Sequence, residues 1–378
     1  AETTDIQGKT QNGTPTFTPG NPEVPMDDEV PATFEDGSTT KTIPGEGTYT
    51  VAPDGTVTFT PEKNFTGKGT GVTVQREDKN GTPVTAKYTP VVKKATPTGT
   101  DAVTEDIQGS TQTGKPTFEG GKVTVNGEEK TVEIDETVKP TFDDGTTEKK
   151  VPGEGTYTID PTTGAVTFTP EKDFVGTAKG VTVQATATIT NANGKTAIIT
   201  SDAKYTPTVV PAVPTESPAT SKDIQGATQT GTPSFAGTTV QVNGEDKAIT
   251  IKDNSYTLLD SDGNEVTSTP AYAADGTTEI GTYSIDSATG QVTFTPTDKS
   301  YTGAVTPAKV QAESSNGIKV DTTYTPEIVP VTPTATPAET TDIQGATQTG
   351  KPEFKGGTVT VDGVEKTVEI NEDVPATF

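Results

Sequence analysis

The sequence predicts an all-β protein built of tandem β-sandwich repeats of immunoglobulin-like size. Three observations predict this fold class. A set of motifs returns in the same order along the 378 residues, the strand-favouring residues Thr and Val are abundant, and 30 Pro and 39 Gly interrupt helices. Because only 28% of the residues are hydrophobic, we expect each repeat to have a thin core.

The repeats are recognised by their opening motif. Asp-Ile-Gln-Gly begins at Asp5, Asp106, Asp223 and Asp342, so successive copies are 101, 117 and 119 residues apart. Each copy continues with Gln-x-Gly-x-Pro, and the first three add Gly-Thr-Tyr, Val-Thr-Phe-Thr-Pro and Tyr-Thr-Pro. We expect the chain to be a segment of a longer array. The predicted domains are repeat 1 (1–100), repeat 2 (101–217), repeat 3 (218–337) and a partial, truncated repeat 4 (338–378).

An early hairpin is predicted in repeats 2 to 4 but not in repeat 1. In repeat 2, apolar residues alternate with polar ones up to Val125, then Asn126-Gly127 provides a pair typical of two-residue hairpin turns, and alternation resumes through Val132. Repeat 1 has a proline-rich stretch, residues 19–25, at this place. The missing hairpin accounts for most of the difference between spacings of 101 and 117 residues.

A central hairpin is predicted in the first three repeats. In repeat 1, Tyr49 and Val51 alternate with polar residues, the segment 53–55 contains Asp-Gly and turns the chain, and Val57 and Phe59 alternate on the way back. Repeats 2 and 3 keep the alternation around a slightly longer turn that contains Thr-Gly.

A third hairpin closes each full repeat. In repeat 1 it consists of a strand at residues 72–75, a turn at Asn80-Gly81 and a strand that ends at Tyr88. The corresponding turns are Asn193-Gly194 and Asn316-Gly317. With six to eight short strands, one copy is long enough to close its own core, so the repeats are expected to be separate domains rather than the short units of a solenoid.

Stretches rich in Pro and Thr connect the repeats, at residues 90–100, 207–218 and 326–337. Pro at this spacing favours extended, semi-rigid, polyproline-like spacers. We therefore expect an extended array and a monomeric rod.

The aromatic residues recur at corresponding positions and are predicted to fill the cores. Tyr256 alone falls outside this pattern, so little remains for a surface on which sugars or bases could stack. The predicted core aromatics are Phe17, Phe34, Tyr49, Phe59, Phe65 and Tyr88 in repeat 1, Phe118, Phe142, Tyr157, Phe168, Phe174 and Tyr205 in repeat 2, Phe235, Tyr272, Tyr283, Phe294, Tyr301 and Tyr324 in repeat 3, and Phe354 and Phe378 in repeat 4.

Composition excludes several classes of function. The sequence has no Cys, Trp or His, which excludes thiol chemistry, Cys/His zinc sites and His-based catalysis. A net charge of -25 opposes binding to nucleic acid and to anionic membranes. No apolar run is long enough to span a membrane, and no signal peptide is recognised in the sequence given. We predict no catalytic, cofactor-binding or metal-binding residues, no cofactor and no enzymatic activity.

The ordered motifs, Asp-Ile-Gln-Gly, Gln-x-Gly-x-Pro, Gly-Thr-Tyr, Val-Thr-Phe-Thr-Pro, Phe/Tyr-x-Gly and Tyr-Thr-Pro, resemble the CshA-type fibril repeat over essentially the whole chain. That family forms the repetitive region of cell-wall-anchored fibrillar adhesins of Gram-positive bacteria. The resemblance implies an extracellular stalk that projects a separate N-terminal adhesive region, with a sorting signal at the far C-terminus.

Two sequence features, a possible calcium site and a possible isopeptide bond, each have a simpler structural interpretation. Residues 260–265, Asp-Ser-Asp-Gly-Asn-Glu, loosely resemble a calcium loop, but the ligand spacing differs from an EF-hand and the other copies lack it, so we interpret it as a polar turn. An intramolecular Lys–Asn isopeptide bond would need recurring partners. Lys87 and Lys204 correspond to Thr323 in repeat 3, and Asn64 corresponds to Asp173 and Ser300, so we interpret these residues as solvated surface positions.

Three further groups of polar residues are interpreted as structural. Glu46 and Glu154 precede Gly-Thr-Tyr in a Gly-rich turn, where we expect them to be exposed. The six Asn-Gly pairs are interpreted as turns. The motif at residues 5–8 is expected to open the repeat with a buried Ile and a Gly in a turn, and a ligand role for its Gln has no support.

Two functions from different classes follow. The first is a structural stalk or spacer of a bacterial surface fibril, whose acidic surface repels neighbouring fibrils and whose contacts with host matrix or other fibrils come from regions outside this sequence. The second is that the repeats themselves adhere to host protein, to glycan or to each other.

Overall fold

The computed structural model describes residues 1–378, apart from the side chains of Lys195, Ala197 and Ile198. All of its named elements are strands. Within the described residues, no helix is long and apolar enough to cross a membrane. The chain forms two compact units, which are described separately: unit 1 contains residues 1–106 and 110–209, and unit 2 contains residues 107–109 and 210–378.

Repeat 1, in unit 1, is a sandwich of two sheets. One sheet has the order β1-β9-β8-β3, with β7 also paired to β9, and the other has the order β2-β6-β5-β4. The strands are β1 (Glu2–Ile6), β2 (Gln11–Gly13), β3 (Thr33–Phe34), β4 (Thr40–Ile43), β5 (Gly47–Val51), β6 (Val57–Pro61), β7 (Gly67–Lys68), β8 (Val72–Glu77) and β9 (Pro83–Lys93).

The predicted hairpins of repeat 1 are confirmed. β5 pairs with β6 so that Tyr49 lies opposite Phe59, and β8 pairs with β9 across the Asn80-Gly81 turn. Side chains from both sheets meet between them, because alternate residues of each strand point inward. The buried cluster consists of Ala32, Phe34, Tyr49, Val51, Val57, Phe59, Val72, Val74, Tyr88 and Val92.

Repeat 2 has the same two sheets and three additions. The first sheet has the order β11-β22-β21-β16, with β20 on β22, and the second has the order β12-β19-β18-β17. The additions are the predicted early hairpin β14–β15, a short pair β10–β13, and longer strands β21 and β22. The strands are β10 (Thr98–Thr100), β11 (Ala102–Ile107), β12 (Gln112–Gly114), β13 (Thr117–Glu119), β14 (Gly121–Val125), β15 (Glu128–Val132), β16 (Thr141–Phe142), β17 (Glu148–Val151), β18 (Gly155–Ile159), β19 (Val166–Pro170), β20 (Gly176–Thr177), β21 (Val181–Asn191) and β22 (Gly194–Val210).

Repeat 3, in unit 2, repeats the architecture with the sheets β24-β35-β34-β29-β30 and β25-β33-β32-β31. Its early hairpin is β27–β28. The strands are β23 (Thr215–Ser217), β24 (Ala219–Ile224), β25 (Gln229–Gly231), β26 (Ser234–Ala236), β27 (Thr239–Val242), β28 (Glu245–Ala248), β29 (Thr257–Leu259), β30 (Glu265–Val266), β31 (Ser268–Tyr272), β32 (Glu279–Ile285), β33 (Val292–Pro296), β34 (Ala308–Glu313) and β35 (Lys319–Val329).

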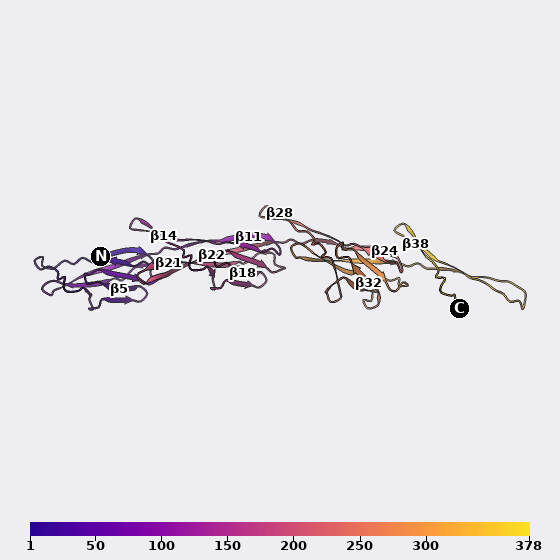
Figure 1. Ribbon diagram of the computed structural model, residues 1–378, viewed down its shortest axis with the longest axis horizontal. Coiled ribbons are helices and arrows are strands. Elements are labelled where there is room, and N and C mark those ends of the chain that lie inside the picture. Colours follow the sequence, from indigo (N-terminus) through magenta and orange to yellow (C-terminus); the bar gives the residue numbers. More distant parts are fainter. The chain divides into compact units, whose positions relative to one another are not determined.

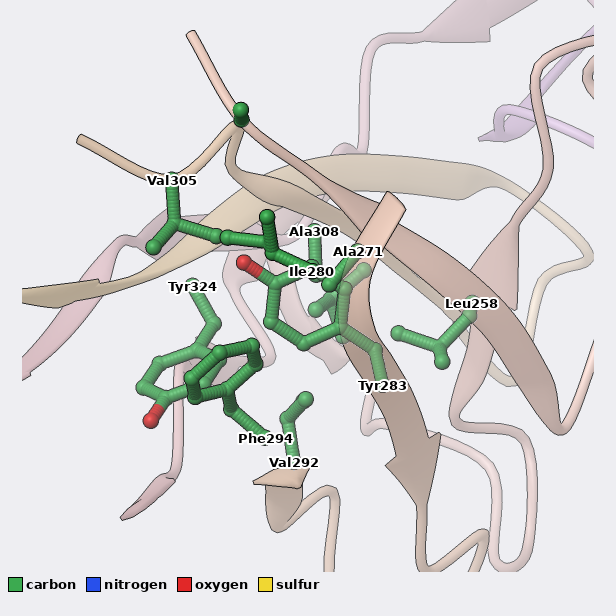
Figure 2. Packing of buried hydrophobic residues seen from close by; sticks show 11 residues of the cluster. Leu258, Ala271, Ile280, Tyr283, Val292, Phe294, Val305, Ala308 and Tyr324 are labelled. Carbon is green, nitrogen blue, oxygen red and sulfur yellow. The ribbon is translucent and has the colours of Figure 1, made fainter. Parts of the chain in front are cut away.

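The aromatic assignment in repeat 3 is wrong at one position. Leu258 pairs with Val310 as Phe142 pairs with Val183, so Leu258 and not Tyr272 takes the place of the core phenylalanine. Figure 2 shows Leu258 pointing toward Tyr283 inside the cluster. The insertion that obscured this correspondence is the hairpin β29–β30, which repeats 1 and 2 lack.

Repeat 4 is represented by two strand pairs, β36–β37 and the early hairpin β38–β39. The Ile of its opening motif, Ile343, is 80% exposed, whereas Ile6 is buried. The predicted core residues Phe354 and Phe378 are exposed as well. The strands are β36 (Thr334–Thr336), β37 (Glu353–Lys355), β38 (Gly357–Val361) and β39 (Val364–Val368).

The Pro/Thr stretches differ from the predicted polyproline-like spacers. Residues 90–93 are the end of β9, and residues 98–100 form β10, so only a few residues lie between strands. At the centre of each stretch one small or β-branched side chain is buried: Ala95, Ala212 and Val331. One predicted turn is also wrong, because Asn12-Gly13 lies in β2, where Gly13 packs so closely that a Cβ would be 2.2 Å from the Tyr88 ring.

Candidate joint between consecutive repeats

The Asp-Ile-Gln-Gly motif forms the end of the first strand and a tight turn. In repeat 1, the Asp5 carboxylate accepts a hydrogen bond from the Ile6 N–H at 2.8 Å. The Gln7 N–H donates to the Lys93 carbonyl, which ties the turn to the last strand of the repeat. Gly8 has φ 79°, a conformation that favours glycine. The motif therefore presents Ile6 where the chain leaves the repeat.

The early hairpin of repeat 2 packs on this motif, and β14 lies beside β1 near the N-terminus (Figure 1). An apolar cluster separate from the two sandwich cores joins the repeats, and its buried members come from both of them. It contains Ile6 from the motif and Ala95 from the connection, against Val125 and Val132 from the hairpin and Ala187 from β21. We call this cluster with its surrounding hydrogen bonds the joint.

Polar contacts surround the apolar cluster of the joint. The Lys130 ammonium lies 2.8 Å from the Asp5 carboxylate, so the Asp of the motif is paired with the hairpin. The Lys93 ammonium donates to the Thr124 carbonyl at 2.8 Å, and the Ala192 N–H donates to the Thr10 hydroxyl at 3.1 Å. The two lysine contacts hold the hairpin against repeat 1, and the Ala192 contact holds the turn between β21 and β22 against it.

The hairpin begins with a glycine because the connection passes close to it. A Cβ on Gly121 would lie 2.6 Å from the carbonyl carbon of Thr96. In repeat 4, a Cβ on Gly357 would lie 2.5 Å from the Thr332 carbonyl oxygen in the same way. Real Cβ atoms are not found at these distances, so a larger residue would displace the hairpin from the connection.

The joint recurs in unit 2 between repeat 3 and the hairpin of repeat 4. The Lys366 ammonium lies 3.1 Å from the Asp223 carboxylate, which repeats the pairing of Lys130 with Asp5. Val331 and Val361 are buried there. The Gln225 side-chain oxygen accepts a hydrogen bond from the Val331 N–H at 2.9 Å. The motif, including its Gln, thus contacts the chain that leads into the next repeat.

A second recurring site lies inside each sandwich. The Thr3 hydroxyl lies 2.6 Å from the Gln11 side-chain oxygen and 2.7 Å from the Tyr88 hydroxyl, and Gln11 donates to the Val91 carbonyl at 3.0 Å. Because Gln11 and Tyr88 are buried, these hydrogen bonds offset the cost of removing polar groups from water. The same arrangement uses Thr104, Gln112 and Tyr205 in repeat 2, and Ser221, Gln229 and Tyr324 in repeat 3.

The expected exposure of Glu46 and Glu154 is wrong, since both are buried. The Glu46 carboxylate accepts hydrogen bonds from the Tyr49 hydroxyl and, at 2.8 Å, from the Thr70 N–H. Burial raises the pKa of Glu46, but these hydrogen bonds outweigh burial and hold its pKa below the usual value. The carboxylate anchors the loop 69–71 to the core, which is a structural role.

The two special sites considered from sequence lie in ordinary surface positions. The Asp260 carboxylate accepts hydrogen bonds from the Asp262 and Asn264 N–H groups, at 2.9 and 2.8 Å, in the turn of β29–β30. These contacts describe an Asx turn. Among the described residues, no group of three or more acidic side chains is arranged to hold a metal ion. Lys87 and Asn64 are both exposed.

Sequence reasoning missed two features that matter for function. It treated the early hairpin as a part of its own repeat, although alternating Val residues on an otherwise polar two-stranded hairpin signal a face that needs a partner. It also assigned Phe17, Phe118 and Phe235 to the core, whereas all three are only half-buried.

The comparison with protein families gives one match. The family described as surface adhesin CshA repetitive domain matches residues 1–92, 94–209 and 211–328. No curated protein matches the chain.

Among solved structures, the chain is similar to repeat domain 13 of the fibrillar adhesin CshA from Streptococcus gordonii, with 67% identity over 19% of this chain and 94% of that chain and a TM-score of 0.13. It is also similar to the I9–I11 tandem of titin, with 11% identity, 87% of this chain and 96% of that chain covered and a TM-score of 0.31. A mouse cadherin-23 fragment, EC22–24, has 15% identity, the same coverages of 87% and 96%, and a TM-score of 0.23.

Proposed function

The chain belongs to the CshA repeat family, and we propose that its repeats form the stalk of a fibrillar adhesin, transmitting tension between a cell surface and a distal binding region. The function is mechanical and non-enzymatic. The proposal places the chain outside the cell, on a fibril that is anchored in the wall of a Gram-positive bacterium. Host matrix or neighbouring fibrils would be contacted by regions outside this sequence.

One observation carries the proposal: the first and last strands of a repeat are parallel neighbours. In repeat 1, β1 pairs with β9 from Glu2 opposite Thr89 to Ile6 opposite Lys93, and in repeat 3, β24 pairs with β35 in the same way. Tension on the two ends of the repeat pulls these strands in opposite directions along their length. The hydrogen bonds between them are then loaded together rather than one after another, which resists unfolding.

The experiment is to stretch the single chain from its two ends and record each unfolding step. Unfolding of repeat 1, from β1 to β9, should lengthen the chain by about 30 nm, and unfolding of repeat 2 or 3 by about 37 nm, because extended chain spans about 3.5 Å per residue. Step length therefore distinguishes unfolding of repeat 1 from unfolding of repeat 2 or 3. Because the Thr89 N–H donates to the Ala1 carbonyl, the alternation of a parallel ladder makes the Thr3 N–H face β9. We expect Thr3→Pro, within β1, to lower the unfolding force of the shorter step by at least half, because Pro lacks this N–H donor.

Thr3→Val is the matched control, since it removes the hydroxyl that contacts Tyr88 but keeps the backbone N–H. Its shorter step should need a force much closer to that of the unaltered chain. The stalk function would be refuted if the unaltered repeats unfolded at forces no higher than those of the Thr3→Pro repeat.

A further inference from the structure

The half-buried phenylalanines Phe17, Phe118 and Phe235 mark one place on the surface of the three full repeats. Each follows the Gln-x-Gly-x-Pro motif and packs against the edge of its sandwich core. The side chain that covers the phenylalanine ring differs among the three repeats. Comparing these side chains indicates which kind of group the surface site can bind.

In repeat 1 an arginine covers the ring. The Arg76 guanidinium lies 5.8 Å from the centroid of Phe17, within range of a cation–π contact. It donates to the Asp28 carboxylate at 2.7 Å and to the Asp27 carbonyl at 3.3 Å. The Arg76 side chain is only 12% exposed. Repeat 1 therefore contains a guanidinium site that consists of an aromatic face, a carbonyl and a carboxylate, and among the described residues the buried Nε of Arg76 has no hydrogen-bond partner.

In repeat 3 a tyrosine covers the ring. Tyr256 packs against Phe235 with their centroids 5.8 Å apart. The position of Arg76 is Ala312, which follows Val310-Gln311 as Arg76 follows Val74-Gln75. The one aromatic that departs from the repeat pattern thus fills the space that arginine fills in repeat 1.

In repeat 2 the arginine is replaced, but its acceptors remain. Ala185 takes the place of Arg76, and Pro140 takes the place of Tyr256. Asp135 and Glu136 correspond to Asp27 and Asp28. The correspondence is fixed by backbone pairing, because Asp135 N–H donates to the Thr186 carbonyl at 2.9 Å just as Asp27 N–H donates to Glu77 at 2.9 Å.

Repeat 2 accordingly has a hollow at this place, with a volume of about 660 Å³. Its floor is Ala185, which is buried, beside the half-buried Phe118. Its lining includes Ile134, Asp135, Glu136 and Pro140. Asp135 holds this segment in shape, because its carboxylate accepts hydrogen bonds from the Thr137 and Thr188 hydroxyls at 2.7 and 2.6 Å. The Glu136 side chain is left at the exposed rim.

We propose that the hollow of repeat 2 binds an arginine side chain presented by another protein. The guanidinium would lie over the Phe118 ring and donate to the Glu136 carboxylate, as Arg76 does with Phe17 and the Asp28 carboxylate of repeat 1. This site is independent of the stalk function, and it would make repeat 2 adhesive in its own right.

Arginine fits this place better than the alternatives. Its planar guanidinium can lie flat on a ring while its N–H groups donate in the same plane, whereas a lysine ammonium is a compact point charge without a planar face. Lys115 and Lys139 also line the hollow, but both are exposed. The partner cannot be a second copy of this chain, because Arg76 is the single arginine of the sequence and is already bound in repeat 1.

The test uses the full chain, labelled with ¹⁵N, and N-acetyl-argininamide as the probe. We expect saturable shifts of amide resonances confined to the hollow, including those of Glu136 and Ala185, with no response around Phe17 in repeat 1. Ala185→Arg should fill the hollow from within and weaken binding at least tenfold, while Glu136→Gln should weaken it about threefold, in keeping with the loss of one exposed ion pair.

A second variant checks that the site is the one described. Arg76→Ala empties the corresponding place in repeat 1, so the probe should then also shift resonances around Phe17. N-acetyl-lysinamide and N-acetyl-tyrosinamide are the matched probes, and both should bind more weakly than the arginine compound. Equal or stronger binding of either, binding that survives Ala185→Arg, or the absence of any saturable shift would each overturn the proposal.

Discussion

Glu46 and Ile280 occupy the same place in repeats 1 and 3, directly before the Gly of Gly-Thr-Tyr, and both are buried. In repeat 1 the tyrosine hydroxyl donates to the carboxylate, whereas in repeat 3 the Tyr283 hydroxyl donates to the Thr306 carbonyl at 2.7 Å. Ile280 lies within the same cluster as the Tyr283 ring (Figure 2). The fold therefore accepts a charged or an apolar residue here, provided that the buried hydroxyl finds an acceptor.

This exchange predicts that the stability of repeat 1 depends on pH through Glu46. Because the pKa of Glu46 is lowered on folding, its stabilising contribution is present above the unfolded pKa of about 4.3 and is lost as pH falls through the folded pKa. Glu46→Gln should destabilise repeat 1 by about 2 kcal/mol at neutral pH, the value of hydrogen bonds to a charged group. The loss should shrink toward acid pH.

The measurement is urea unfolding of the full chain, followed through amide resonances of each repeat. Asp36 and Asp54 also have lowered pKa values in repeat 1, so the difference between the unaltered chain and Glu46→Gln isolates the one carboxylate. Repeat 3, with Ile280, is the internal control. A difference that stayed constant from neutral to acid pH would show that the charge of Glu46 is irrelevant.

At the scale of elements, the early hairpin depends on a neighbour for its order. β14 and β15 pair only with each other, and an isolated two-stranded hairpin is marginally stable in water. Its Val125 and Val132 are buried because Ile6 and Ala95 of repeat 1 cover them. A residue more than a hundred positions away thus stabilises the hairpin.

We predict that Ile6→Ala loosens the β14–β15 hairpin without unfolding the sandwich of repeat 2. Truncation of a buried Ile costs about 2 kcal/mol or more, so the hairpin amides should exchange with solvent about thirtyfold faster. Hydrogen exchange resolved by residue measures this. Ile343→Ala is the matched control, because the same motif residue is exposed in repeat 4 and its truncation should leave exchange unchanged. Unchanged exchange in the Ile6→Ala hairpin would mean that the joint does not hold it.

The elements with a strong local signal were predictable, and those that depend on a partner were not. Asn126-Gly127 specifies its turn within two residues, and both adopt positive φ as a tight hairpin requires. By contrast, the sequence around Val132 says that one face is apolar but not which repeat covers it. The aromatic pattern did not predict Leu258 as a core residue, because an aliphatic side chain can fill a buried position as well as an aromatic one.

The functional features also depend on residues distant in sequence, and the local sequence did not predict them. Buried Glu46 follows a Gly-rich turn that looks exposed in sequence, and its burial depends on Tyr49 and on a loop twenty-four residues later. The hollow of repeat 2 is visible only by comparing which residue covers each phenylalanine. In sequence, Ala185 is simply a small residue in a strand. Only the comparison with repeat 1, which has Arg76 at the equivalent position, shows that a larger side chain is missing there.

At the scale of the whole molecule, two effects could keep an array of repeats extended. One is mutual repulsion from a net charge of -25, which salt screens over about 10 Å at 0.1 M. The other is the joint, in which an apolar cluster and close backbone packing hold the connection. Apolar contacts do not weaken when charges are screened, so the two causes differ in their response to salt.

We predict that the joint, not the charge, sets the step per repeat. Small-angle X-ray scattering from chains of residues 1–100, 1–217 and 1–337 should show a maximum dimension that grows by a near-constant step of about 30–40 Å, the length of a ten-residue strand. Raising the salt from about 0.01 to about 0.5 M should leave that step unchanged, although the Debye length falls several-fold. Ile6→Ala should broaden the distance distribution of the two-repeat chain at either salt concentration. A step that shrinks with added salt would instead make charge repulsion the cause of the extension. A maximum dimension that stops growing at the third repeat would mean that the repeats fold back on one another, which would contradict the stalk function.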